Sequence, residues 1–313
     1  MNLENKISNL IKNISDKGYS TALNQFLENN LDFENEFKKM EGSIAFRVSN
    51  STNSRCLVIN SDFGNIPENL SHTFQEVWSF EKNLDKALIQ KHRFENKNIQ
   101  NITIINTKKE LLSIPNEYFE LVVLNGIKQE DFSELGINNY INQIKKNLTE
   151  NGCMCVGANN KYGINIFGKE KEDISNKKEI NESFNQYKKI FTASGFSVKP
   201  YWVFPSHTRP HYSANIENNI ALEWFFHNFD KTFSVDKKFS LIKNSLKILN
   251  STLRKMLVER FAPSFLFYCY HNKIPENIED MIIKKTGLDN CVQNIRHSKI
   301  MYILLDSLGI PQK

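Results

Sequence analysis

Short apolar runs alternate with amphipathic segments through the middle of the chain. The runs have the length and apolar content of buried strands, and the segments between them repeat apolar residues at helical spacing. Strands separated by helical crossovers predict a parallel sheet with helices on both faces. The predicted strands are Cys56 to Ile59, Val77 to Phe80, Ile102 to Ile105, Leu121 to Leu124, Cys153 to Gly157 and Phe196 to Phe204. The predicted helices are Pro67 to His72, Leu84 to Phe94, Tyr140 to Leu148 and Phe184 to Ala193.

The two ends of the chain and one long insertion fall outside this alternation. Apolar residues from Ile7 to Phe26 recur at helical spacing, and so do those from Ile278 onward. Phe265 to Tyr270 reads as one more buried strand after the insertion. The predicted domains are a helical cap at residues 1–50, a core at 51–205 and 262–273, a helical insert at 206–261 that forms a substrate lid, and a helical C-terminal extension at 274–313.

Composition and charge narrow the range of partners. The chain has 313 residues, 40% of them hydrophobic, which is enough for a sizeable core. Its 40 basic and 35 acidic residues are spread over the whole length, so the net charge of +5 does not indicate nucleic acid as a partner. No stretch approaches the roughly 20 apolar residues of a membrane span, and the N-terminus has no apolar signal core. We therefore expect no membrane span.

The cysteines indicate a reducing environment. There are five, an odd number, and their spacing does not suggest a disulfide framework, which predicts a cytoplasmic protein. Cys153 and Cys155 point to the same face of a predicted strand. Since no second Cys or His pair stands nearby to complete a metal site, we interpret them as core thiols.

Polar residues follow the predicted strands where a parallel sheet binds its ligands, at the carboxyl ends. The first strand runs into Asn60-Ser61-Asp62-Phe63-Gly64, a polar turn with one glycine. Glu81 follows the second strand, where a carboxylate can accept from both hydroxyls of a ribose. Asn106 follows the third strand, and Asn125-Gly126 ends the fourth.

This succession resembles the class I S-adenosylmethionine-dependent methyltransferases. The strand and turn at Gly64, the acid Glu81, the polar Asn106 and the run Phe119 to Gly126 carry the resemblance, together with Thr149 to Gly152 and Ala193 to Phe196. Two further stretches, Ala158 to Ile164 with Gly168 and Tyr201 to Pro210, resemble the branch that acts in sugar and surface-polysaccharide biosynthesis.

The resemblance implies an α/β fold with a Rossmann-like, seven-stranded, mostly parallel sheet whose last strand, Phe265 to Tyr270, is antiparallel. It implies S-adenosylmethionine as the cofactor and a small-molecule or glycan acceptor. The cofactor would lie over Gly64, with Glu81 on its ribose and Asn106 near its adenine. The residues implied to bind it are Asn60, Asp62, Gly64, Glu81, Asn106 and Asn125.

A hydroxyl acceptor also needs a group that removes its proton. His207, His211 and Tyr212 lie just after the sixth predicted strand and are the candidates for acceptor contact or proton removal. The alternative interpretation is that these are loop residues that cap the insert. Both interpretations remain open at the level of the sequence.

The chain departs from the family pattern in its first motif. Val58 stands where the family has an acid, and Asn60 and Asp62 stand where it has glycines. Asn and Asp are the side chains that tolerate positive φ angles best, so the turn can still form. A second hypothesis is therefore an inactive, methyltransferase-like binding or scaffold subunit, with its pocket filled by Asn60, Asp62 or Phe63. Either a homodimer or a heteromeric partner is compatible with the sequence.

Overall fold

The structure is a computed structural model of the chain. It describes residues 3–33, 37, 54–107, 114–132, 136–163, 179–219, 222–223, 249–274, 283–284, 291–296 and 299–304.

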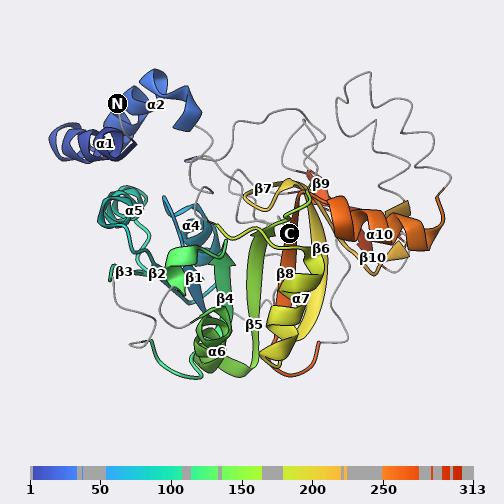
Figure 1. The fold of residues 1–313 in the computed structure, drawn as a ribbon. Helices are drawn as coiled ribbons and strands as arrows, with labels where there is room; N and C mark the ends of the chain where they lie inside the picture. Colours follow the sequence, from blue (N-terminus) through green and yellow to red (C-terminus); the bar gives the residue numbers. More distant parts are fainter. Residues whose placement is uncertain are drawn as a thin grey trace, which may run out of the picture.

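A single mixed sheet forms the centre of the molecule (Figure 1). Its strands lie in the order β3-β2-β1-β4-β5-β8-β6-β7-β9. Neighbours among β1 to β5 are parallel, and β8 is antiparallel to both β5 and β6. The strands are β1 (Arg55–Ile59), β2 (Glu76–Phe80), β3 (Ile102–Ile105), β4 (Phe119–Asn125), β5 (Leu148–Asn159), β6 (Ser197–Ser206), β7 (Arg209–Asn215), β8 (Ser264–Tyr270) and β9 (Ile283–Lys284).

The predicted α/β fold, with an antiparallel strand at Phe265 to Tyr270, is confirmed by this sheet. The predicted number of seven strands is wrong. Two further strands, β7 and β9, extend the edge beyond β6, so the sheet has nine strands among the residues described. The strand β7 lies in the stretch for which a helical insert was predicted. It forms because the chain folds back directly after β6, pairing Ser206 with Arg209.

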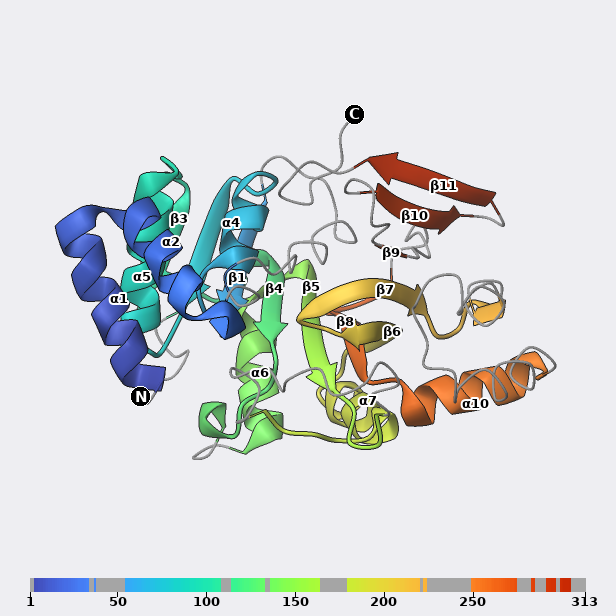
Figure 2. The same ribbon diagram turned by 90° about the horizontal axis from the view of Figure 1, so that it is seen from above.

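Helices cover both faces of the sheet (Figure 2). Along β1 the side chains alternate, so Leu57 and Ile59 face one core cluster while Cys56 and Val58 face the other. The first cluster packs against α6 and α7, and the second packs against α4. The helices that follow the first strands are α4 (Asn65–Ser71), α5 (Leu84–Asn96), α6 (Ile137–Asn147) and α7 (Phe184–Ala193).

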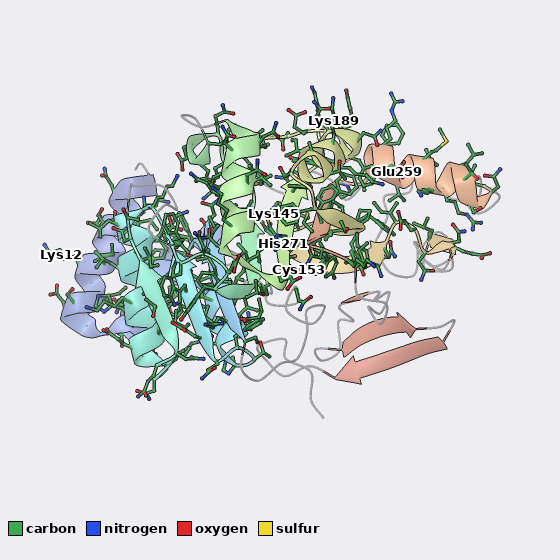
Figure 3. The ribbon with its side chains drawn as sticks, turned by 90° about the horizontal axis from the view of Figure 1, so that it is seen from below. Lys12, Lys145, Cys153, Lys189, Glu259 and His271 are labelled. Atoms are coloured by element: carbon green, nitrogen blue, oxygen red, sulfur yellow. The ribbon has the colours of Figure 1, made fainter. Side chains whose placement is uncertain are left out.

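The buried cysteines confirm part of the sequence interpretation. Cys56, Cys153, Cys155 and Cys269 are buried and free. Figure 3 labels Cys153, which lies on β5 between β4 and β8. Within the described residues no group of His, Cys, Asp and Glu is suited to hold a metal ion.

The N-terminal residues form the helices α1 (Leu3–Lys17) and α2 (Tyr19–Asn29), followed by the short 3-10 helix η1 (Leu31–Phe33). They pack on α5 and share one apolar cluster with Phe63, a residue of the turn after β1. Phe63 stacks on Phe37 with ring centroids 4.5 Å apart. The N-terminal segment therefore shares its apolar cluster with the turn that the sequence singles out. None of the helices described has the length and hydropathy needed to cross a membrane.

The C-terminal segment is not helical where it is described, so the predicted helical extension is wrong there. The strands β10 (Cys291–Arg296) and β11 (Lys299–Leu304) form an antiparallel hairpin. Val292 pairs with Ile303, and Ile295 pairs with Ile300. These β-branched residues suit a strand, and their spacing fits a short strand as well as a helix. In the predicted insert, the helix α10 (Ser251–Phe261) is described, and residues 224–248 lie outside the described residues.

Candidate functional site

The turn between β1 and α4 has an unusual backbone. Asn60, Asp62 and Gly64 all have positive φ angles, of 60°, 48° and 88°. Asn and Asp reach this left-handed region at the lowest cost among residues with a side chain. Gly64 has no substitute, because a Cβ there would lie 2.8 Å from Cζ of Phe94 and 3.0 Å from Cγ of Gln90. The turn thus keeps a glycine-like path with only one glycine among these three positions.

Glu81, directly after β2, is hydrogen-bonded to this turn. Its Oε2 accepts from the Asp62 N–H at 2.9 Å, and its Oε1 accepts from the Asn83 N–H at 2.9 Å. A carboxylate has about four acceptor positions, so about two remain for a ligand. Burial raises the pKa of the Glu81 carboxyl, and the nearby Lys86 ammonium only partly offsets this rise. Asn106, after β3, donates to the Glu81 carbonyl at 2.7 Å.

The end of β4 closes the same site from the other side. Asn125 donates to the Asn60 carbonyl and to Oδ2 of Asp62, both at 3.2 Å. Asn60 in turn donates to Oδ2 of Asp131 at 2.9 Å and to the Gly126 carbonyl at 3.2 Å. One edge of the sheet therefore gathers all the residues that the resemblance implied for the cofactor: Asn60, Asp62, Gly64, Glu81, Asn106 and Asn125.

Three lysines that sequence reasoning missed surround this polar cluster. Lys86 Nζ lies 2.5 Å from Oδ1 of Asp62, and Lys128 Nζ lies 3.8 Å from the same oxygen. Lys82 Nζ lies 3.0 Å from Oδ1 of Asp131. Lys82 and Lys128 follow the ends of β2 and β4 within three residues, and that position was the one signal available in the sequence, whereas Lys86 lies in the first turn of α5.

A second buried pair lies next to the loop after β4. His207 is 1% exposed and packs on Gly157, where an added Cβ would lie 2.4 Å from its Cδ2. Its Nε2 lies 3.8 Å from Oε2 of Glu179, which also accepts from Asn159 Nδ2 at 2.9 Å. Glu179 lies against Gly126, where an added Cβ would be 2.4 Å from Oε1. Sequence reasoning singled out His207 and missed Glu179, which no motif marks.

The other two candidates for acceptor contact are placed by their backbone alone. His211 and Tyr212 belong to β7, and Tyr212 is paired with Phe204 of β6. Their side chains lie outside the described part of the chain, so their roles stay predictions.

A cavity of about 390 Å³ opens between η4 (Gln129–Asp131), α6 and α7. Its lining mixes apolar side chains such as Phe132 and Ile190 with the polar Gln129 and Gln186. Ile180, next to Glu179 in the chain, also contributes to it. The cavity therefore adjoins the segment that carries Glu179.

No protein-family model matches the sequence, and no curated protein matches it significantly. Solved structures resemble the fold at low identity. Phosphoethanolamine N-methyltransferase 2 of Haemonchus contortus, in complex with phosphomonomethylethanolamine and S-adenosylhomocysteine, is 13% identical with a TM-score of 0.49. The match covers 84% of this chain and 59% of that protein.

Two further structures match over nearly their whole length. A putative methyltransferase of Haloferax volcanii, in complex with the Trm112 activator, is 10% identical with a TM-score of 0.48, over 84% of this chain and 98% of that one. A putative methyltransferase of Bacillus halodurans is 11% identical with a TM-score of 0.45, over 74% and 99%. Matches at these TM-scores support no functional assignment.

Proposed function

We propose that the chain is a class I S-adenosylmethionine-dependent methyltransferase acting on a small-molecule or glycan acceptor of the sugar type. The observation that carries the proposal is the hydrogen bond from the Asp62 N–H to Glu81. It joins a left-handed turn after β1 to a carboxylate after β2, beside the point where the strand order reverses between β1 and β4. Open α/β sheets bind ligands at this edge.

The residues present suit an adenosyl cofactor. Glu81 retains acceptor positions for two ribose hydroxyls, and Asn106 lies beside it for the adenine. Gly64 and the neighbouring turn let the backbone approach the ligand closely. When bound, S-adenosylmethionine supplies an activated methyl group, and the protein aligns the acceptor with it.

In this proposal the acceptor is contacted or deprotonated by one of three residues, His207, His211 and Tyr212. His207 faces Glu179, so a carboxylate stands ready to stabilise a protonated imidazole. A hydroxyl acceptor would lose its proton to one of these side chains during transfer. The sugar-type acceptor is supported by the resemblance of Ala158 to Ile164 and of Tyr201 to Pro210.

Calorimetric titration with S-adenosylmethionine and S-adenosylhomocysteine tests the proposal. We expect micromolar binding that weakens about tenfold or more in Glu81→Gln, because hydrogen bonds to a charged acceptor are the strong ones. Glu76→Gln is the control, since Glu76 lies at the opposite end of the same strand and bonds Trp78 and Tyr118. Equal affinity in wild type and Glu81→Gln would exclude the assigned site.

One observation favours the second hypothesis, an inactive binding or scaffold subunit. Asn60, Asp62 and Phe63 are 5%, 7% and 4% exposed, so the side chains of the turn are themselves buried. If they fill the cofactor space, the wild type gives no heat with either nucleoside. The double variant Asn60→Gly/Asp62→Gly would then gain binding, whereas under the methyltransferase proposal it gains none.

A further inference from the structure

Two buried serine hydroxyls of the sheet stand out among the described residues. Ser213 of β7 and Ser264 of β8 are both 0% exposed, and within the described part of the chain neither Oγ atom has a hydrogen-bond partner. A buried hydroxyl without a partner is costly, because it has lost its contact with water and gained no bond in exchange. The buried hydroxyl of Ser79, by contrast, is hydrogen-bonded to Ser61 and Gln90. The hydroxyls of Ser213 and Ser264 therefore point to a role other than stabilising the fold.

The strand register places the two serines in one row across the sheet. Figure 2 shows β5, β8, β6 and β7 side by side. Asn159 pairs with Ser264, and Val203 pairs with Ser264 on one side and with Ser213 on the other. Paired residues point to the same face of a sheet, here the face of the cluster that contains Val203. We call these four residues the hydroxyl row.

The hydroxyl row lies at the ligand-binding edge of the sheet. Asn159 is the last residue of β5, and Ser264 is the first residue of the antiparallel β8. Asn159 donates to Oε2 of Glu179, the oxygen that faces His207. His207 packs on Gly157, which lies two residues before Asn159 and on the same face. The row therefore begins next to a residue proposed to take the proton of the acceptor.

We propose that the hydroxyl row binds an uncharged, polyhydroxylated ring of the acceptor, with Ser264 and Ser213 each hydrogen-bonded to a hydroxyl of that ring. This inference rests on the proposed function and narrows its acceptor. Two strand spacings separate the serines by about 10 Å, which admits a sugar ring between two hydrogen bonds of about 2.8 Å each. A ligand hydroxyl both donates and accepts, as a serine hydroxyl does.

Charge selects against an anionic ring at this place. No residue of the hydroxyl row is a cation, and the carboxylate of Glu179 at its end repels a phosphate or a carboxylate. Val203, between the two serines, offers an apolar contact instead. Because the serines and Val203 are fully buried, the ring enters only when the chain that covers the row moves aside.

Thermal stability separates a ligand-binding hydroxyl from a structural one. Ser213→Ala and Ser264→Ala each remove a buried group without a partner, so the melting temperature should stay unchanged or rise by about 1–3 °C. Ser79→Ala breaks existing hydrogen bonds and should lower it by about 2–6 °C. A fall in both row variants as large as that of Ser79→Ala would assign the hydroxyls to the fold and overturn the inference.

Methyl transfer to simple glycosides tests the binding role. The full chain is incubated with methyl-labelled S-adenosylmethionine and the methyl α-glycosides of glucose, galactose and mannose, with α-glucose 1-phosphate as the charged comparison. We expect a higher kcat/KM for at least one neutral glycoside than for the phosphate. Ser213→Ala and Ser264→Ala should each lower that kcat/KM about fivefold or more. Ser197→Ala, at the opposite end of β6, is the matched control and should leave it unchanged.

Calorimetry with S-adenosylhomocysteine distinguishes this inference from the proposed function. Both row variants should bind it within about twofold of wild type, since the row lies outside the cofactor site. Cofactor binding without transfer to any neutral glycoside, a preference for the phosphate, or wild-type kcat/KM in both row variants would overturn the inference alone. Absence of cofactor binding in wild type would contradict the proposed function itself.

Discussion

Substituting Gly126 by Ala tests the contact that joins the loop after β4 to Glu179. Gly126 has φ of +76°, and a Cβ there would lie 2.4 Å from Oε1 and 2.5 Å from Cδ of Glu179. Gly136 offers a control without the clash, since it has the same φ of +76°, with ψ of 152°, and nothing within 4 Å of an added Cβ. The pair separates backbone strain from the displacement of a buried carboxylate.

The magnitudes follow from these two effects. An alanine held at an unfavourable positive φ costs about 1–3 kcal/mol. This strain is the whole effect expected for Gly136→Ala, whose ψ is 152°. In Gly126→Ala the carboxylate must also move away from Asn159 Nδ2, which loses a charged hydrogen bond worth about 1.5–3 kcal/mol. We therefore expect Gly126→Ala to lower the free energy of unfolding by about 2.5–6 kcal/mol.

Urea denaturation followed by circular dichroism measures both variants. The second substitution Glu179→Ala removes the clash, so Gly126→Ala should cost only the backbone strain in that background. A loss for Gly126→Ala that is as large in the Glu179→Ala background as in the otherwise unchanged protein would refute the placement of Glu179 against the loop.

Three more predictions concern buried polar contacts. Burial alone would raise the pKa of Glu68, but Arg93 and Lys97 outweigh burial and lower it. The ionised carboxylate therefore stabilises the fold above the ordinary pKa of 4.5. This stabilisation is lost as the pH falls through the lowered pKa. Glu68→Gln should cost about 3 kcal/mol at pH 7 and much less at pH 3 in urea titrations; a constant loss would contradict the ion pair. Gln90→Leu should lower the free energy of unfolding by about 2–4 kcal/mol, because the Gln90 amide is hydrogen-bonded to two buried hydroxyls and a turn carbonyl. A melting temperature within a degree of the wild-type value would disprove this. Gly157→Ala should displace the ring of His207, which lies 2.4 Å from the added Cβ, and unchanged His207 ring signals in NMR spectra would speak against that packing.

The core of the fold was predictable because its strands are short apolar runs bounded by polar turns. The φ angles at Asn60 and Asp62 were also predictable, since these are the side chains that a left-handed turn tolerates. The β10–β11 hairpin was not, because its apolar residues fit both a helical and a strand period.

Lys128 and Glu179 could not be predicted from the sequence for a different reason. Lys128 meets Asp62 and Glu179 meets Gly126 only because distant strand ends converge at one edge of the sheet. No local pattern in the sequence encodes such pairs. The predicted helix Tyr140 to Leu148 ends one residue too late for a related reason, because pairing of Leu148 with Phe119 ends α6 at Asn147 and starts β5 there.

Amide hydrogen exchange with and without S-adenosylhomocysteine tests the central claim most directly, because it locates the ligand on the chain. The account predicts slower exchange at three separate strand ends: the turn from Asn60 to Gly64, Glu81 to Asn83, and Asn125 to Lys128. Binding with protection confined to other segments, or with none at these three, would contradict it.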